Sequence, residues 1–559
     1  MEKKWFKHYH PETPHTINPD EYGSLVDLIE SSCKKYKHNI AFINLGSSIS
    51  YQELDEKSLA FAHFLQHLGL QQGCRVALML PNILQYPIAL FGVLRAGMIA
   101  VNTNPLYTAD EVAHQMTDSG SEVIIVLANF AKTVQLALDR TPLKHVIITE
   151  LGDCFAPWKR LLANFIIKYI KKMVPHYNLA KTNVIAFNNY LSIQPVKKFI
   201  RHNITHQDIA LLQYTGGTTG VSKGAMLTHG NLVANLLQAY TWLQHCNLGP
   251  NDRVITALPL YHIFSLTANC LVFLKTGSKN LLITNPRDIQ RFINSIKNFK
   301  FTVMTGVNTL YKTLLDHPDI AKVDFSHLKI ALSGGMALQA HIAERWQAYT
   351  HNTLIEAYGL TEASPAVTIN IPDKCNQHGC IGLPLPSTDV SIRNEQNQEV
   401  SPNEPGELCV KGPQVMAGYW HHPEETAAVM TQDGYLKTGD IATMDEQGFV
   451  YIADRKKEMI IISGFNVYPT EIEQVIARHP GVKEVAIIGI KQTQATTGEI
   501  TEIVKACIVK QDPKLTPEAI TQYCREHLTA YKIPKRIEFY AELPKTAVGK
   551  ILKRALNNS

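Results

Sequence analysis

A glycine-rich loop between two apolar runs is the part of the chain whose residue types point most directly to chemistry. The loop Thr215-Gly216-Gly217-Thr218-Thr219-Gly220-Val221-Ser222-Lys223-Gly224 contains four glycines, four hydroxyl side chains and a lysine. Polyphosphates are bound by closely approaching backbone N–H groups, by hydroxyl donors and by a countercharge. A Walker A loop would end in Gly-Lys-Ser/Thr and open a helix, whereas here Ser222 precedes Lys223 and another apolar run follows. The sequence therefore predicts a phosphate-binding loop of a different kind.

Two strands must position this loop, and similar segments recur along the chain. Residues 209–214 before the loop and 225–227 after it are apolar runs that predict strands. β-Branched runs that alternate with helical stretches are typical of the α/β class, with parallel sheets and crossover helices. Further strands of this kind are predicted at 75–80, 122–126 and 145–149.

The C-terminal part of the chain has a different pattern of predicted elements. From about Val390 onward, short alternating strands with turn signals predict an antiparallel β unit, and the charge cluster 454–458 then precedes a segment that predicts a small α+β domain. We predict a large N-terminal domain, residues 1–454, of α/β subdomains plus the β unit, and a small mobile C-terminal α+β domain, residues 455–559. The charge cluster is interpreted as a hinge, with a solvated surface turn as the alternative.

Composition excludes several classes of protein. The 559 residues are 45% apolar and 18% charged, which argues against disorder, collagen and coiled coils. The net charge of +5 is small for this length and does not indicate a nucleic-acid partner. The cysteines are scattered and the N-terminus lacks an apolar run, so we predict a cytoplasmic protein with reduced thiols and no structural metal.

Two apolar stretches, 76–94 and 254–274, are long enough to be examined as membrane spans. Proline and amide residues near their centres, such as Pro81 and Pro259, are expensive in hydrocarbon. Both stretches are therefore predicted to be buried segments of an α/β core.

Six motifs in order along the chain resemble the signature of the adenylate-forming enzymes, which include acyl-CoA synthetases, luciferases and nonribosomal peptide synthetase adenylation domains. Residues 433–460, and the pairing of Pro105-Leu106-Tyr107 with residues 464–469, are similar to bacterial long-chain fatty acid–CoA ligases. Besides the loop, the motifs are Leu258-Pro259-Leu260-Tyr261-His262, Tyr358-Gly359-Leu360-Thr361-Glu362, Tyr435-Leu436-Lys437-Thr438-Gly439-Asp440, Asp454-Arg455-Lys456-Lys457-Glu458 and Leu543-Pro544-Lys545-Thr546-Ala547-Val548-Gly549-Lys550.

The resemblance implies an AMP-forming acid–thiol ligase that converts a long-chain fatty acid to acyl-CoA through acyl-AMP, releasing AMP and pyrophosphate. Its substrates would be fatty acid, ATP and coenzyme A, with Mg²⁺ accompanying ATP. Adenylation is needed because a carboxylate resists attack by a thiol, whereas AMP is a good leaving group. A medium-chain or aryl acid CoA ligase and a fatty acyl-AMP ligase stay open as alternatives. A noncatalytic nucleotide- or lipid-binding membrane scaffold is disfavoured because Lys550, Glu362 and Asp440 are all present.

The resemblance also implies roles for single residues at the ATP site. Asp440 would accept the ribose hydroxyls, with Arg455 as support, and Thr361 would bind the α-phosphate. Thr215 and Glu362 would contact Mg²⁺, because that cation prefers oxygen ligands. The β- and γ-phosphates would lie on Thr215, Gly216, Gly217, Thr218, Thr219, Gly220 and Lys223, and the adenine would be framed by Gly335, Glu356, Ala357, Tyr358 and Gly359.

Three further residues complete the predicted site. Lys550 would lie between the substrate carboxylate and the α-phosphate and neutralise charge on both, which requires closure of the two domains. The domain rotation would pivot at Lys457. His262 would border the acyl site, although a lone histidine in an apolar run is more often a core residue. Some long-chain members carry a gating tryptophan at the position of Leu266. The leucine here therefore predicts neither a tryptophan-gated tunnel nor the length of the acyl chain.

A stretch without acidic residues is the second feature that points to function. Between Asp153 and Asp208 there are nine lysines and arginines and no carboxylate. Within it, the apolar residues of 158–173 recur at the spacing of one helix face, with five basic residues off that face. Such a helix is typical of an in-plane anchor on anionic lipid, and a surface helix packed on its own domain is the open alternative. We predict peripheral association with the inner face of the cell membrane, and a homodimer is left open.

Overall fold

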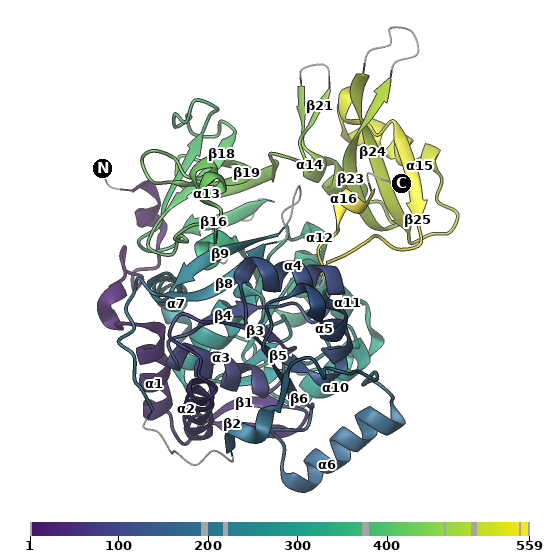
Figure 1. Ribbon diagram of the computed structural model, residues 1–559. Coiled ribbons are helices and arrows are strands. Elements are labelled where there is room, and N and C mark those ends of the chain that lie inside the picture. The colour runs from purple at the N-terminus through teal and green to yellow at the C-terminus, as the bar shows by residue number, and fades with distance from the viewer. Residues whose placement is uncertain are drawn as a thin grey trace.

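The computed structural model describes residues 3–191, 199–215, 222–371, 379–462, 465–493, 500–546 and 549–556 (Figure 1). Two large sheets and their helices form the body of the molecule, and a smaller unit formed by the C-terminal residues lies at one end of it. The predicted α/β class, with a large N-terminal and a small C-terminal part, is confirmed.

A seven-stranded sheet carries the phosphate loop. Its strands are parallel except for the last pair, β8 and β9, which is antiparallel. The predicted strands are confirmed, and β5 has all five side chains buried, which explains its continuous apolar run. In spatial order the strands are β7 (Asn183–Ala186), β6 (His145–Thr149), β5 (Val123–Leu127), β3 (Arg75–Met79), β4 (Ile99–Asn102), β8 (Ile209–Thr215) and β9 (Lys223–Thr228).

A thirteen-stranded sheet forms the second large layer. The antiparallel β unit predicted from Val390 is present, but it is continuous with a parallel sheet rather than separate from it, because β15 and β16 pair with both parts. In spatial order the strands are β17 (Asp389–Arg393), β18 (Gly406–Lys411), β19 (Leu436–Met444), β20 (Val450–Arg455), β16 (Cys380–Pro384), β15 (Ala366–Ile369), β14 (Leu354–Gly359), β13 (Ile330–Gly334), β12 (Val303–Gly306), β10 (Arg253–Thr256), β11 (Lys279–Leu282), β1 (Ile40–Asn44) and β2 (Ser47–Ser50).

Helices connect the strands and cover both sheets. Residue types at their ends explain several boundaries: Thr108 and Glu111 form a capping box at the start of α4, and Gly120 ends that helix in the left-handed conformation. The α-helices of this part are α1 (Leu25–Lys35), α2 (Tyr51–His67), α3 (Gln85–Arg95), α4 (Ala109–Ser119), α5 (Ala131–Ala137), α6 (Pro157–Phe165), α7 (His229–Trp242), α8 (Ile263–Ser265), α9 (Val272–Thr276), α10 (Ile289–Ile296), α11 (Asn308–Asp316), α12 (Ala340–Thr350) and α13 (Pro423–Val429).

Short helices of other pitch complete the connections. Two are π-helical, η5 (Ile166–Ile170) after α6 and η8 (Leu266–Leu271) between α8 and α9. The 3₁₀ helices are η1 (Lys4–His8), η2 (Pro19–Glu21), η3 (Ala128–Phe130), η4 (Leu138–Arg140), η6 (Phe187–Leu191), η7 (Gln244–Cys246), η9 (Pro318–Lys322), η10 (Thr361–Ala363) and, in the C-terminal unit, η11 (Ala530–Lys532).

The C-terminal unit has its own hydrophobic core. The core residues, such as Val467, Ile487 and Val504, all follow the charge cluster in sequence. The unit therefore has the internal packing expected of a separate domain. Its elements are β21 (Ile460–Ile462), β22 (Phe465–Val467), α14 (Pro469–Ile476), β23 (Val482–Thr493), β24 (Ile500–Lys510), α15 (Pro517–His527), β25 (Arg536–Tyr540) and α16 (Lys553–Leu556).

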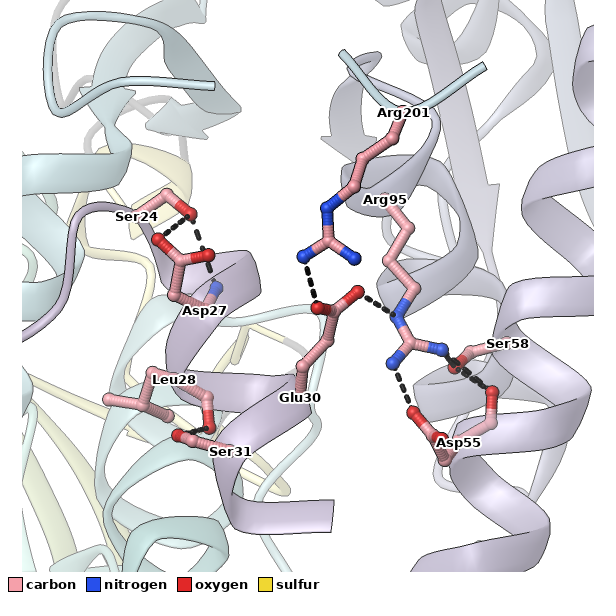
Figure 2. Close-up of polar contacts among 9 residues, drawn as sticks. All are labelled: Ser24, Asp27, Leu28, Glu30, Ser31, Asp55, Ser58, Arg95 and Arg201. Atoms are coloured by element: carbon pink, nitrogen blue, oxygen red, sulfur yellow. Dashed lines mark hydrogen bonds and ion pairs between the residues drawn. The ribbon is translucent and has the colours of Figure 1, made fainter. Parts of the chain in front are cut away.

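A buried arginine ties the first three helices together (Figure 2). Arg95 of α3 is 4% exposed, forms an ion pair with Asp55 of α2 and donates to Ser58 Oγ at 3.0 Å. Its Nε lies 3.6 Å from Oε1 of Glu30 of α1, and the same carboxylate also pairs with Arg201, in the segment that leads to β8. This network fixes the helical layer behind the phosphate-loop strands.

Several predictions about single segments have clear outcomes. The stretch 76–94 forms β3 and α3, 254–274 forms β10 and the α8–α9 region, and no helix among the described residues is long and apolar enough to cross a membrane. The predicted helix 158–173 is present, but its regular part ends at Phe165 and a π-turn continues to Ile170. The prediction that all thiols are reduced is wrong at Cys380, which is disulfide-bonded.

Candidate functional site

One cavity of about 2000 Å³ lies between the two units and brings together most of the predicted site residues. Residues from all six motifs line it, although the first and the last motif are more than 300 positions apart in the chain. The predicted residues that line the cavity are Thr215, Lys223, His262, Gly335, Ala357, Tyr358, Gly359, Thr361, Glu362, Arg455, Lys457 and Lys550.

The two ends of the phosphate loop meet at the cavity. Thr215 ends β8 and Lys223 begins β9, and the two residues are register partners in the antiparallel pair. The ammonium of Lys223 lies 3.3 Å from Glu425 and 5.6 Å from the ring centre of Tyr419. The predicted ligands Gly216, Gly217, Thr218, Thr219 and Gly220 lie outside the described residues. The loop thus begins and ends at the cavity, with its cation facing inward.

Oxygen ligands suited to a hard cation face the same cavity. Glu362, in the short helix η10 after β14, accepts a hydrogen bond of 2.7 Å from the Tyr419 hydroxyl, and Thr215 contributes a hydroxyl. Among the described residues, no group of three or more His, Cys, Asp or Glu side chains could hold a metal ion. The donor set fits Mg²⁺ that receives its remaining ligands from phosphate and water.

A buried carboxylate on β19, Asp440, is not among the lining residues but contacts two of them, Tyr358 and Arg455. Asp440 is 3% exposed, its Oδ1 lies 2.7 Å from Nε of Arg455, and its Oδ2 accepts a hydrogen bond of 2.5 Å from the Tyr358 hydroxyl. Burial raises the pKa of Asp440, and the positive charge of Arg455 acts against that shift. The β19–β20 pairing places Asp440 opposite Arg455, so the sheet register builds this pair.

Strand β14 supplies part of the cavity wall. Glu356 accepts a hydrogen bond of 3.0 Å from the Leu338 backbone N–H, and burial raises the pKa of Glu356 to about 7. A Cβ at Gly359 would lie 2.2 Å from the Pro365 carbonyl oxygen, so only glycine fits there. Gly335 lies at the end of the neighbouring strand β13 and leaves the cavity open beside Ala357.

Lys550 reaches the cavity from the C-terminal unit. Its backbone N–H donates to Thr546 Oγ1 at 3.0 Å, and its carbonyl accepts from the Thr546 N–H at 2.7 Å. Gly549 has a φ of +86°, and a Cβ there would lie 2.7 Å from Oγ1 of Thr309 in α11. Burial lowers the pKa of Lys550, and Arg455 lowers it further, while Glu458 and Asp440 oppose the shift. A tight loop thus holds a half-buried lysine against the large unit.

The connector between the units is held by charges on both sides. Asp454 accepts a hydrogen bond of 2.7 Å from the Thr470 N–H, and Lys456 pairs with Glu407 at 2.9 Å. Glu458 pairs with Lys553 at 2.9 Å, so the connector also contacts the helix that follows Lys550. Lys457, the predicted hinge residue, lines the cavity.

His262 lies at the start of an apolar part of the cavity lining. It is half-buried, its Nδ1 accepts a hydrogen bond of 3.3 Å from the Phe264 N–H, and burial lowers its pKa to about 4, so the ring is neutral at pH 7. Leu266, in place of the gating tryptophan, is 1% exposed. We call the following cavity residues the acyl wall: Ala239, Leu243, Val272, Phe273, Val303, Ile330, Leu332 and Ile369.

Sequence reasoning missed several residues of this site. Tyr419, the partner of Glu362, and Glu425, the partner of Lys223, belong to no predicted motif. Thr309, against which the Lys550 loop lies, is a third example. These contacts depend on tertiary packing between distant segments, and no local pattern in the sequence signals them.

The chain matches two families and many curated proteins. Residues 29–420 match the family described as AMP-binding enzyme, and residues 471–550 match the AMP-binding enzyme C-terminal domain. A long-chain-fatty-acid–CoA ligase of Escherichia coli O157:H7 is 50% identical over 100% of this chain and 98% of that protein. A ligase of the same name from Bacillus subtilis is 38% identical over 99% of this chain and 98% of that protein.

Solved structures share the fold along nearly the whole chain. The ATP-bound crystal structure of MatB from Rhodopseudomonas palustris has a TM-score of 0.78 at 28% identity, covering 95% of this chain and 98% of that one. An anthranilate CoA ligase in complex with anthranoyl-AMP has a TM-score of 0.83 at 24% identity, covering 97% and 98%, a similarity that concerns the fold alone.

Proposed function

The chain belongs to the AMP-binding enzyme family, and on that premise we propose that it is a long-chain fatty acid–CoA ligase. It activates a fatty acid with ATP to acyl-AMP and then transfers the acyl group to coenzyme A. The full-length identity to long-chain-fatty-acid–CoA ligases supports this activity. The observation that carries the proposal is the single cavity that joins the phosphate loop, Lys550 and the acyl wall, since the reaction brings a polyphosphate and an apolar acid together.

In the first half-reaction a carboxylate oxygen of the fatty acid forms a bond to the α-phosphorus of ATP, and the bond to the pyrophosphate oxygen breaks. The protein's task is to bring two anions together, which requires positioning and positive charge. We assign this task to Lys550, with Thr361 at the α-phosphate and Thr215, Thr218, Thr219 and Lys223 at the β- and γ-phosphates. Thr215 and Glu362 would hold Mg²⁺, which supplies charge neutralisation at the phosphates.

The remaining assigned residues hold the nucleoside and the acid. Asp440 accepts the ribose hydroxyls while Arg455 and Tyr358 keep its carboxylate in place. Gly335, Glu356, Ala357 and Gly359 frame the base. His262 stays neutral beside the reacting carboxylate, and the acyl wall receives the chain. In the second half-reaction the coenzyme A thiolate attacks the acyl carbon, and AMP leaves.

Two further features of the proposal concern the whole chain. The division into residues 1–454 and 455–559, with rotation at Lys457 between half-reactions, is supported by the separate core of the C-terminal unit. We also place the protein in the cytoplasm, associated peripherally with the membrane that supplies its substrate.

A pyrophosphate-release assay across a panel of acids, with and without coenzyme A, tests the proposed function. Acids of 12 to 18 carbons should give coenzyme A-dependent turnover at least about tenfold above that of medium-chain and aryl acids. Preference for an aryl acid would contradict the assigned substrate. Pyrophosphate release without acyl-CoA formation would instead indicate a fatty acyl-AMP ligase.

A further inference from the structure

The helix α6 and its continuation η5 form an arm, residues 157–173, at the edge of the molecule. Figure 1 shows α6 at the opposite end from the C-terminal unit, projecting beyond the sheets. No residue of α6 or η5 is buried. The arm is therefore a surface element, and the question is which of its faces the protein itself covers.

Polar side chains attach the arm to the protein. The Lys159 ammonium donates to the Leu45 carbonyl at 2.8 Å and lies 3.1 Å from Ser47 Oγ. Asn164 donates to Glu150 at 2.7 Å and accepts from the Gly152 N–H at 2.8 Å. The Arg160 guanidinium pairs with Asp153 at 3.2 Å. In an ordinary amphipathic helix the polar face lies in water. In this arm the polar face contacts the domain.

The large apolar side chains of the arm are exposed instead, and several of them line an open groove beside Tyr190 and Leu191. Seven large apolar residues are between 52% and 73% exposed: Trp158, Leu161, Leu162, Phe165, Tyr169, Ile170 and Met173. By contrast, the amphipathic helix α10 buries its apolar residues Phe292, Ile293 and Ile296. Exposing such a face costs free energy in water, so the arrangement favours an apolar partner outside the chain. The alternative of a helix packed by its apolar face on its own domain does not agree with this geometry.

The charge around the exposed face identifies the partner. Lys168, Lys171 and Lys172 form no ion pair with any described residue, and the segment from 154 to 207 contains no carboxylate. A second copy of this chain, docked symmetrically on the same face, would set these cations against their own copies. A bilayer with anionic headgroups instead offers hydrocarbon for the apolar face and negative charge for the lysines.

We propose that the arm inserts its apolar face into the headgroup and acyl boundary of an anionic phospholipid bilayer, with Lys168, Lys171 and Lys172 on lipid headgroups. The inference rests on the peripheral association proposed above and names its contact surface and lipid class. It does not depend on the catalytic assignment, because the arm contributes no residue to the active-site cavity.

Co-sedimentation of the full-length protein with vesicles tests the proposal. Wild-type protein should bind vesicles containing anionic phosphatidylglycerol and bind poorly to pure phosphatidylcholine. The triple variant Lys168→Gln, Lys171→Gln, Lys172→Gln should lower binding to the anionic vesicles by about a hundredfold, at roughly fivefold per lysine. The triple variant Leu161→Ser, Phe165→Ser, Ile170→Ser should lower it by at least about tenfold.

Matched controls separate this effect from loss of fold or charge. Lys34→Gln, Lys514→Gln, Lys535→Gln removes the same charge elsewhere, and Leu59→Ser, Leu136→Ser, Val184→Ser removes exposed apolar side chains elsewhere. Both controls should bind like wild type. All variants should retain the thermal midpoint of the wild-type protein and its pyrophosphate release with a soluble acid. If the wild-type protein released no pyrophosphate, that result would refute the ligase assignment and leave the membrane proposal untouched.

The fluorescence of Trp158 reports insertion directly. Anionic vesicles should shift the protein's emission to the blue, and Trp158→Phe should remove that shift. Binding that is unchanged in both arm variants would overturn the proposal. A concentration-dependent dimer in sedimentation velocity, lost in the apolar variant, would also overturn it in favour of a second copy of the chain.

Discussion

Among single residues, Lys550 is the side chain whose pKa and charge depend most clearly on its surroundings. It is half-buried, and burial and the positive charge of Arg455 both lower its pKa. It forms no ion pair with any described residue, so its charge is available to substrate anions. A lysine held in this way can neutralise a carboxylate and a phosphate as they approach.

Lys550→Ala is therefore expected to reduce acyl-AMP formation by at least about a hundredfold. Coenzyme A transfer from supplied acyl-AMP should change by less than about fivefold, because that step no longer joins two anions. ATP–pyrophosphate exchange and thioester formation from synthetic acyl-AMP measure the two steps. The exposed Lys535→Ala is the control. Equal loss of both half-reactions would refute the assigned role.

Glu356 gives a prediction about pH. Burial raises its pKa in the folded state to about 7, above the value near 4.3 of an unfolded chain. The folded state therefore binds more protons in between, and stability from this group is lost as the pH rises through about 7. Because Gln resembles the protonated acid, Glu356→Gln should not alter the free energy of unfolding near about pH 4 and should increase it by about 1–3 kcal/mol near about pH 8.

Urea unfolding of the ligand-free protein at several pH values measures this effect. The difference between variant and wild type is the relevant quantity, since histidines with lowered pKa values, such as His229 and His262, titrate as well. Glu344→Gln, on the exposed side of α12, is the matched surface control. A constant offset at all pH values would mean that the pKa of Glu356 is the same in the folded and unfolded states, which would contradict the prediction.

At the scale of elements, the Arg95 network shows how three helices are fixed behind the sheet (Figure 2). Arg95→Met would leave Asp55 and Glu30 without their shared cation, and we expect a loss of about 2–3 kcal/mol in unfolding free energy. Both carboxylates keep partial access to water, which limits the loss. Arg201→Gln removes the exposed ion pair of the network and should lower the free energy of unfolding by less than about 1 kcal/mol. If denaturant unfolding gave the same loss of unfolding free energy for both variants, the result would contradict the larger role of Arg95.

The acyl wall gives a prediction about substrate length. Ala239 on α7 faces the cavity, and Ala239→Phe would fill space that the chain of a long acid would occupy. The ratio of turnover with a 16-carbon acid to that with an 8-carbon acid should fall by at least about tenfold. The ratio does not depend on the fraction of folded enzyme. Ala234→Val, on the same helix and outside the cavity lining, should leave it unchanged.

The sequence predicted elements better than the contacts between them. Strands such as β5 and β6 were predicted to within a residue because buried parallel strands are continuous apolar runs. The end of α6 was not predicted correctly, because the π-turn at Ile166–Ile170 has no local signal in the sequence. The site motifs were recognised by resemblance, whereas the pairing of Tyr419 with Glu362 depends on packing between segments 57 positions apart.

At the scale of the whole molecule, the two units meet around the cavity in an arrangement that suits the first half-reaction. Lys550 and Glu362 line the same cavity although they belong to different units. Thr309 of α11 lies against Gly549, and Lys312 of the same helix donates to the Lys483 carbonyl of the C-terminal unit. In the proposed mechanism Lys550 lies against the reacting carboxylate, and coenzyme A transfer needs access to the same carbon, so we propose that the C-terminal unit moves between the two steps.

Lys457→Pro tests where that movement occurs. Proline restricts the backbone at this position and therefore hinders rotation. Because Lys550 and Glu362 already line the same cavity, acyl-AMP formation should stay within about threefold of wild type, whereas coenzyme A transfer should slow by at least about tenfold. Lys457→Ala keeps the backbone free and should affect neither step, which separates the backbone from the side chain. Rapid-quench measurement of both half-reactions gives the comparison, and an unchanged transfer rate in Lys457→Pro would place the pivot at another residue of the connector.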